Sequence, residues 1–524
     1  MAGDTHDQLV LLALLSVLAA LVALAPAIRV PYPILLVLAG LGLAFVPGVP
    51  EVELPPELVL VGVLPPLLYS GGFFTSLRDF RANAGQISLL AVGGVAATMA
   101  GVAAVAHAAI PGVGWPTAFV LGAVVAPTDP LAATAIARRL GIPSRIVTIV
   151  EGEALVNDGT ALALYRSAVV AAAAGTFSLA DALGRFALGI VGGIAVGLVV
   201  GWLVAQVRIR LDNIQAEIAV SLLTGYLAYI PAQALHVSGV IAAVTVGIYL
   251  GWRSPELSTL AMRMQGVAVW ETLVFLVNAL LFGLVGLQLR PILQSLSGRS
   301  VGELVRDATL VCAAVVAIRA VCVFAIAYGG RRRGAGERPR WDYAAAVSWM
   351  GLRGAVSLAA ALALPLTTDA GRPFPDRALV IFLAFCVILG TLVVQGLTLP
   401  GLLSLLRFEE DERMDREASK ARIHAADAAL ARLDELAVEE WVREDTAERM
   451  RGLYGFRRSR FAARFGEGDE AIEARSLDYQ RLRHELLEAE RNAIVDLRRR
   501  GLIGDEAMRL VVRDLDLEDA RLEY

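Results

Sequence analysis

The fold class follows from IVTIVEGEALVNDGTALALY, residues 146–165, an apolar stretch that contains Glu153, Asn157 and Asp158. A charged side chain at the centre of a bilayer costs at least ~2.5–3.5 kcal/mol on insertion scales. A chain that keeps Glu153, Asn157 and Asp158 in such a segment is expected to use them. The first hypothesis is therefore an ion or proton pathway.

The composition indicates a membrane protein. The chain is 56% hydrophobic, above the roughly 45–50% that is usual for soluble domains. At least four windows of about 18 or more residues carry almost no charge, and each can cross ~30 Å of hydrocarbon as a helix. Breaks at Arg, Gly and Pro give thirteen candidate spans, at about residues 8–28, 33–47, 57–74, 86–110, 116–138, 146–173, 184–207, 214–232, 237–252, 266–289, 305–328, 343–364 and 377–404.

We therefore predict an all-α membrane protein with about 13 transmembrane helices. Spans 1–6 and 8–13 are expected to form two inverted six-helix repeats, with span 7 as the connector and a discontinuous helix in each repeat. The first block is counted as a span and not as a cleaved signal peptide, because its leading residues MAGDTHDQ contain no basic residue.

The charge pattern predicts the orientation and a second domain. With the N-terminus outside, inside loops carry fifteen arginines against six in outside loops, which fits the positive-inside rule and places the C-terminus in the cytoplasm. Residues 407–524 hold 23 of the 47 basic and 30 of the 51 acidic residues. We expect a transmembrane domain at 1–406 and a cytoplasmic helical tail at 407–524. A solvated appendage that aids folding or dimer contact is favoured for the tail over a dedicated regulator.

A helix break is predicted in GAVVAPTDPLAATAIARR, residues 122–139. Pro127 and Pro130 have no N–H group, so the helix should break between them. This break exposes backbone carbonyls and the side chains of Thr128 and Asp129. Such oxygens are hard ligands for a small cation. A simple proline kink is the alternative.

Within the 146–165 stretch, Glu153 and Asn157 lie about 40° apart around a helix, whereas Asp158 lies about 140° from Glu153. The two carboxylates therefore face different neighbours, so that one can line an ion site while the other is held in a structural pair. Asn157 can donate and accept hydrogen bonds without titrating.

Two arginines also lie in apolar spans, Arg319 in VCAAVVAIRAVCVFAIAY and Arg353 in SWMGLRGAVSLAAALALP. Each needs a counter-ion or a wet cavity. We expect two of the four acids in or near the membrane to neutralise them, which leaves at least one for a cation or proton. These acids are Asp129, Glu153, Asp158 and Glu271.

Six segments together resemble the monovalent cation:proton antiporters of the NhaP and sodium/hydrogen exchanger type. The resemblance covers most of the predicted membrane part, about residues 10–405. The segments are PPLLYSGGFFTSLRDFR (65–81), APTDPLAATAI (126–136), EGEALVNDGTALALYR (151–166), SGVIAAVTVGIYLG (238–251), WETLVFLVNALLFGLVGLQL (270–289) and GLRGAVSLA (351–359).

The resemblance implies a site and a mechanism. Asp158 matches the carboxylate that alternately binds Na⁺ and H⁺, and Thr128 and Asp129 match the unwound crossing that contacts the ion. Glu153 matches an acid that pairs with an arginine of a later span, placed at Arg319. Arg353 matches the arginine of the second broken helix, and asparagine at position 157 is typical of the electroneutral branch, which exchanges one cation for one proton.

The resemblance further implies a homodimer in which each protomer has a static dimerisation domain and a mobile six-helix core. The expected partners are the lipid bilayer, monovalent cations and protons, with no nucleic acid and no cofactor. Family members often have Ser where this chain has Ala154. A hydroxyl ligand one turn from Asp158 is then missing, and water is a possible substitute.

The predicted function is exchange of Na⁺, or of Li⁺ or K⁺, for H⁺ by alternating access in the plasma (inner) membrane, serving pH homeostasis and sodium transport. A K⁺/H⁺ exchanger of the same fold is the first alternative. A cation channel gated by the tail is less favoured. A membrane-embedded enzyme has least support, because the sequence contains no H-E-x-x-H metal-binding motif.

Overall fold

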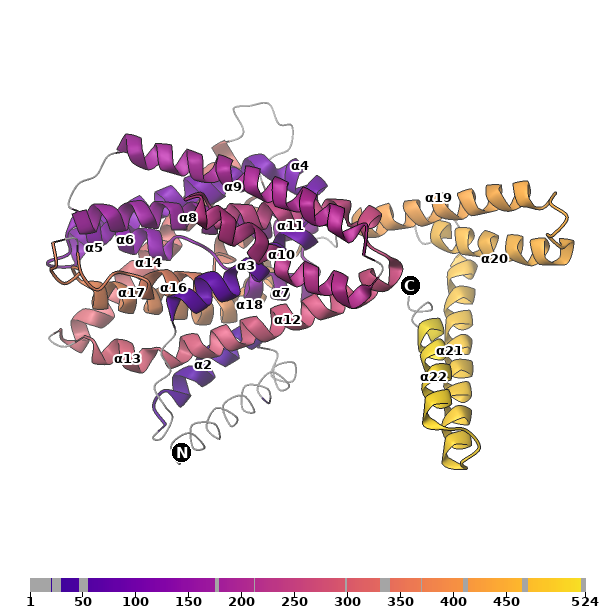
Figure 1. The fold of residues 1–524 in the computed structure, drawn as a ribbon. Coiled ribbons are helices and arrows are strands. Elements are labelled where there is room, and N and C mark those ends of the chain that lie inside the picture. The colour runs from indigo at the N-terminus through magenta and orange to yellow at the C-terminus, as the bar shows by residue number, and fades with distance from the viewer. Residues whose placement is uncertain are drawn as a thin grey trace. The chain divides into compact units, whose positions relative to one another are not determined.

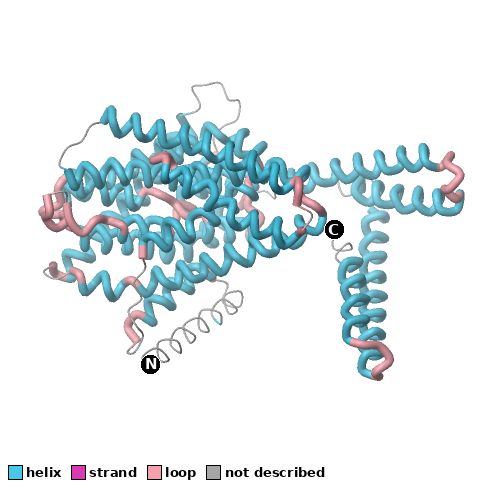
Figure 2. Tube along the Cα trace, viewed as in Figure 1, coloured by secondary structure: helices cyan, strands magenta, loops and turns pink. Residues whose placement is uncertain are grey.

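The computed structural model describes residues 20, 30–46, 55–174, 179–211, 213–296, 299–329, 340–368, 370–408, 413–463 and 470–519. The regular structure within these ranges is helical, and an isolated bridge between Thr367 and Pro373 is the one strand-like pairing there (Figure 2). The predicted all-α class is confirmed. The first predicted span, 8–28, lies outside the described residues apart from Ala20.

The chain forms two compact units, Met1–Glu410 and Asp411–Tyr524. The first is a bundle of closely packed helices (Figure 1). Its elements are α2 (Tyr32–Leu43), η1 (Leu58–Val63), α3 (Leu64–Phe74), α4 (Leu77–Ser88), η2 (Leu89–Gly94), α5 (Val95–Ala109), α6 (Trp115–Val125), α7 (Leu131–Arg139), α8 (Ser144–Ala174), α9 (Leu179–Arg208), α10 (Ile214–Ala234), α11 (Gly239–Leu257), α12 (Leu260–Leu287), α13 (Leu289–Gln294), α14 (Val301–Gly329), α15 (Trp341–Trp349), α16 (Ala355–Leu362), α17 (Arg377–Gly390), η4 (Thr391–Gln395) and α18 (Gly396–Leu406).

The second unit is built from four charged helices. They are α19 (Arg413–Leu436), α20 (Glu444–Ala463), α21 (Glu470–Arg499) and α22 (Asp505–Asp519). Helix α19 packs against α20, and α21 packs against α22. Placement of this unit in the cytoplasm stays a prediction.

Five helices in the described ranges are long and apolar enough to cross a membrane. They are Leu77–Ala109, Leu183–Arg208, Met262–Gln294, Val301–Gly329 and Arg377–Leu406. Apolar side chains of α9 such as Val191 and Val199 are exposed, which suits a surface that contacts lipid and not water. These helices fit a protein that crosses the membrane several times, while the count of thirteen spans and the two inverted repeats stay predictions.

Helix α8, which carries most of the predicted site, packs inside the bundle against α4, α6, α9 and α11. It holds more charges than a lipid-facing helix tolerates, including Glu153 and Asp158. Packing on several sides lets neighbouring helices supply partners for those charges.

The predicted helix break is confirmed. Helix α6 ends at Val125 and α7 begins at Leu131, and the residues between them are not helical. Pro127 and Pro130 account for the break because neither can donate a backbone hydrogen bond.

A second break separates α15 from α16 at residues 351–354. The two breaks meet, since the amide of Asp129 donates to the carbonyl of Leu352 at 2.8 Å. The approach requires glycine at two places. A Cβ on Gly354 would overlap the side chain of Asp129, and a Cβ on Gly351 would overlap that of Arg319.

Candidate ion-transport site

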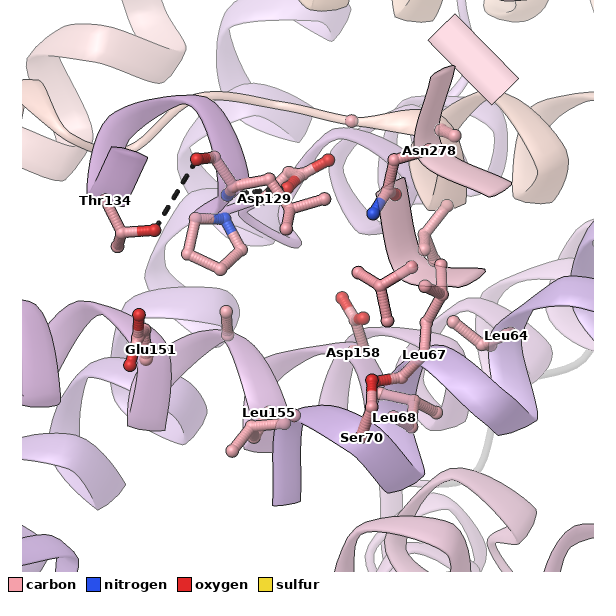
Figure 3. A pocket seen from close by; sticks show the side chains of 18 of the residues that line it. Leu64, Leu67, Leu68, Ser70, Asp129, Thr134, Glu151, Leu155, Asp158 and Asn278 are labelled. Carbon is pink, nitrogen blue, oxygen red and sulfur yellow. Dashed lines mark hydrogen bonds between the residues drawn. The ribbon is translucent and has the colours of Figure 1, made fainter. Parts of the chain in front are cut away.

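A cavity of about 320 Å³ lies beside the crossing of the two broken helices. Its walls come from α3, α8, α12 and both non-helical segments. Asp129 and Asp158 both line it (Figure 3). Thr128 and Ala154 line it as well. Both carboxylates are only half-buried, because each faces the cavity. Asp129, Asp158 and Thr128 therefore offer two carboxylates and a hydroxyl to a small cation.

Asn157 does not line the cavity, but it forms a hydrogen bond with Thr128, which does. Its Nδ2 donates to Oγ1 of Thr128 at 2.6 Å, and both residues are buried. The bond joins the middle of α8 to the non-helical segment between α6 and α7. Asn157 thereby fixes Thr128 and the break relative to Asp158, the next residue along α8.

Asp129 lies in the non-helical segment, two residues before α7 begins. Its Oδ1 accepts a hydrogen bond from the amide of Leu131 at 3.0 Å. A carboxylate at this place also interacts favourably with the positive end of the helix dipole. The main chain therefore helps to stabilise a charged Asp129 without a side-chain cation.

Glu153 and Arg319 form a buried ion pair away from the cavity. Nη1 of Arg319 lies 2.6 Å from Oε1 of Glu153, and Nη2 lies 3.1 Å from Oε2. Arg319 also donates to the carbonyls of Ser348 and Val347 at the end of α15. The side chain thus connects α8, α14 and the second broken helix.

Arg353, unlike Arg319, is bound by a backbone carbonyl and, within the described ranges, not by a carboxylate. It is 1% exposed, its Nη1 donates to the carbonyl of Gly351 at 3.1 Å, and its amide donates to Oγ1 of Thr391. No carboxylate of the described residues forms an ion pair with it. The expectation that two acids neutralise the two arginines is therefore wrong. The physical reason is that the unwound segment frees its own carbonyl to accept from Arg353.

Three of the four acids considered from the sequence thus remain for the cavity. Asp129, Asp158 and Glu271 all line it, whereas Glu153 is consumed by Arg319. At the cavity wall Glu151 pairs with the exposed Arg138 at 2.7 Å.

Sequence reasoning missed two buried polar side chains of the cavity, Asn278 on α12 and Ser357 on α16. Asn278 is the single polar residue of the apolar run LVFLVNALLFGL, residues 273–284, and this was a usable signal. It also missed a buried cluster elsewhere, in which Arg208 donates to Glu217 and Ser258 at 2.7 and 2.8 Å.

Carboxylates in a cavity at the crossing of two broken helices, within a bundle of apolar helices, define an ion-transporting membrane protein. The comparisons with known proteins name the family. The model of the transmembrane sodium/hydrogen exchanger family matches residues 12–405. The chain belongs to the sodium/hydrogen exchanger family.

Individual relatives of the chain carry names that agree with this family. The chain is 37% identical over 535 residues to an uncharacterized Na⁺/H⁺ exchanger of Mycobacterium tuberculosis, covering 99% of this chain and 97% of that protein. It is 30% identical over 433 residues to a sodium, potassium, lithium and rubidium/H⁺ antiporter of Bacillus pumilus, covering 80% and 64%. The structure of the sodium proton antiporter MjNhaP1 of Methanocaldococcus jannaschii matches with a TM-score of 0.62 at 18% identity, covering 78% and 99%, which shows a common fold.

The protein is therefore a membrane-integral transporter of the cation/proton antiport type and not an enzyme.

Proposed function

We propose that the chain exchanges Na⁺ for H⁺ at one carboxylate, Asp158, by alternating access. The observation that carries this proposal is the cavity in which Asp158 and Asp129 face the same space beside Thr128. Glu153, the other acid near the middle of α8, is already neutralised by Arg319. Asp158 thus remains on α8 to bind a cation or a proton at this depth.

The coupling follows from the cost of a buried charge. With neither ligand bound, Asp158 is an uncompensated carboxylate that is expensive to move through the apolar barrier. With Na⁺ or H⁺ bound, that cost falls, so the site changes its exposure only when it is occupied. This energetic gate makes exchange obligatory. Competition between the two ligands for one carboxylate makes the apparent affinity for the cation depend on pH.

The exchange is proposed to be electroneutral. Asn157 neighbours Asp158 but cannot titrate, and its amide is engaged by Thr128. In this proposal Asp158 is the group that alternates between a cation and a proton, so that one cation is exchanged for one proton. Asp129 and Thr128 supply further oxygens to the cation, while Arg353 offsets part of the negative charge near the crossing.

Substitution of Asp158 tests the assignment. We expect Asp158→Asn to abolish Na⁺-dependent proton flux in proteoliposomes while the protein elutes as a folded species. Glu256→Gln is the control, because Glu256 does not line the cavity and its side chain is 71% exposed beside Arg253. If Asp158→Asn retained Na⁺-dependent proton flux, the proposal would be wrong.

Cation preference is a second, separable question. The named activity of the Bacillus pumilus relative includes potassium and lithium, so a K⁺/H⁺ exchanger of the same fold is the alternative. Side-by-side Na⁺, Li⁺ and K⁺ dequenching at several pH values distinguishes the two. A tail-gated cation channel would instead show a reversal potential set by its permeant ion.

We also propose the finer architecture as a whole. It comprises about thirteen spans in two inverted repeats, a homodimer in the plasma (inner) membrane, the N-terminus outside and the tail in the cytoplasm. Alternation of arginines between loops supports the orientation. Labelling of single cysteines placed in the loops from one side of the membrane tests it.

A further inference from the structure

Helix α12 forms a wall of the cavity through one face. Its lining residues recur every three or four positions, as one side of a helix does. They are Trp270, Glu271, Val274, Asn278, Leu281 and Phe282. Asn278 is the single amide among them, and apolar residues flank it on both sides in the chain.

The side chain of Asn278 is buried but does not use its hydrogen-bond donor within the described residues. It is 2% exposed, and its Nδ2 is buried without a hydrogen-bond partner among the described residues. Buried donors in native proteins are almost always satisfied, so an unpartnered one calls for an explanation. The amide nitrogen points into the space that the acidic side chains of the cavity also face (Figure 3).

The charges around this space are predominantly negative. Asp158 projects from α8, Asp129 from the non-helical segment before α7, and Glu271 from α12 itself. Glu151 has its own cation in Arg138, the one basic side chain that lines the cavity. A neutral donor on the opposite wall therefore faces carboxylates that have no side-chain cation in the described part of the cavity.

We propose that Asn278 is a positioning residue of the transport site, whose amide donates to the ionised carboxylate of Asp158, directly or through one water. The inference rests on the proposed role of Asp158. An ionised carboxylate is the stronger acceptor, so this bond favours the form that receives a cation over the form that carries a proton. The amide itself does not titrate, so this bond can form whenever the carboxylate of Asp158 is ionised.

The expected consequence is a change in competition between cation and proton. A hydrogen bond to a charged group corresponds to a factor of about ten or more in an equilibrium. Without it, protons displace Na⁺ more readily at acidic pH. At alkaline pH, where protons are scarce, the loss should matter little.

The test compares Asn278→Leu, which keeps the approximate volume and removes the donor, with Asn278→Gln, which retains an amide. Thr272→Val is the control, because Thr272 lies on α12 outside the cavity and its hydroxyl donates to the carbonyl of Ala268 at 2.8 Å. Na⁺-dependent proton flux is measured in proteoliposomes from pH 6 to 9. Proton release on addition of Na⁺ to the detergent-solubilised protein reports the same competition without transport.

For Asn278→Leu we expect the KM for Na⁺ to rise about tenfold at acidic pH and to approach that of wild type at alkaline pH, with maximal rate retained. Asn278→Gln should recover part of the loss, and Thr272→Val should behave as wild type. An unchanged KM, or an equal fall in rate at every pH, would overturn the inference.

Failure of the inference can be told from failure of the proposed function. If Asp158→Asn is inactive while Asn278→Leu keeps the wild-type pH profile, only the role of Asn278 is wrong. If Asp158→Asn exchanges normally, both are wrong. Should Asn278→Leu fail to fold, Asn278→Ala replaces it and is judged by the same pH profile.

Discussion

Truncation of Arg319 to alanine should lower the stability of the membrane unit severely. The guanidinium contacts both oxygens of Glu153 and two backbone carbonyls, those of Val347 and Ser348. Arg319→Ala leaves the carboxylate of Glu153 on α8 buried without a counter-ion. It also removes the donors that the carbonyls of Val347 and Ser348 at the end of α15 accept from.

The magnitude follows from burial. The side chains of Arg319 and Glu153 are 7% and 3% exposed, and removing one partner of a buried pair costs about 3–5 kcal/mol. The pair of Arg138 and Glu151 provides the comparison, because its separation is almost the same, 2.7 Å, but its side chains are 65% and 30% exposed. Exposed pairs contribute about 0–1 kcal/mol.

Thermal unfolding in detergent, followed by size-exclusion chromatography of the heated samples, measures the difference. Arg319→Ala should melt well below Arg138→Ala, which should stay close to wild type. The double variant Glu153→Leu/Arg319→Met should recover part of the loss, since apolar replacement of a whole buried pair is often tolerated. An Arg319→Ala protein that melts like wild type would refute the reasoning.

Three further predictions concern separate parts of the molecule. Gly354→Ala should slow exchange by on the order of ten- to a hundredfold, because its new methyl group displaces Asp129. Ala154→Ser should lower the KM for Na⁺ about two- to tenfold by adding a hydroxyl one turn from Asp158. In the charged unit, the hydrogen bond to Asp519 raises the pKa of His484 above 6.5 and lowers that of Asp519. Protonated His484 should therefore stabilise the packing of α22 on α21 below about pH 6.5, and this contribution should fade as the pH rises through the raised pKa.

Flux assays in proteoliposomes check the first two predictions, with Gly85→Ala as a control that has open space around the new methyl group. Normal exchange by Gly354→Ala, or an unchanged KM in Ala154→Ser, would contradict them. Hydrogen exchange of residues 505–519 in the full chain at pH 6 and 8 checks the third. The prediction would be contradicted if hydrogen exchange of residues 505–519 changed with pH in the same way in wild type and in His484→Ala.

The parts of the site that depend on local covalent chemistry could be predicted from the sequence. Two prolines three residues apart cannot sustain a helix, so the break around Asp129 followed from Pro127 and Pro130 alone. The separation of Glu153 from Asp158 followed from helical geometry, and the structure places the two carboxylates in different surroundings.

The rest depends on which helices come together, which composition does not encode. Glu217 and Arg208 are nine positions apart in the chain but form a buried pair through the packing of α9 and α10. Asn278 and Asp158 share a cavity although 120 residues separate them. Arg353 donates to the carbonyl of Gly351 in its own unwound segment. The prediction from the sequence counted only opposite charges, so it could not include this backbone acceptor.

The hydrogen bond from the amide of Asp129 to the carbonyl of Leu352 involves no side-chain atom. Replacement of the side chain at either position leaves both bonded groups in place, provided that the backbone is undisturbed. The scaffold of the crossing and the chemistry of the groups it presents are thus specified by different atoms. Ligand sets can diverge during evolution, or be exchanged by design, on an unchanged main-chain framework.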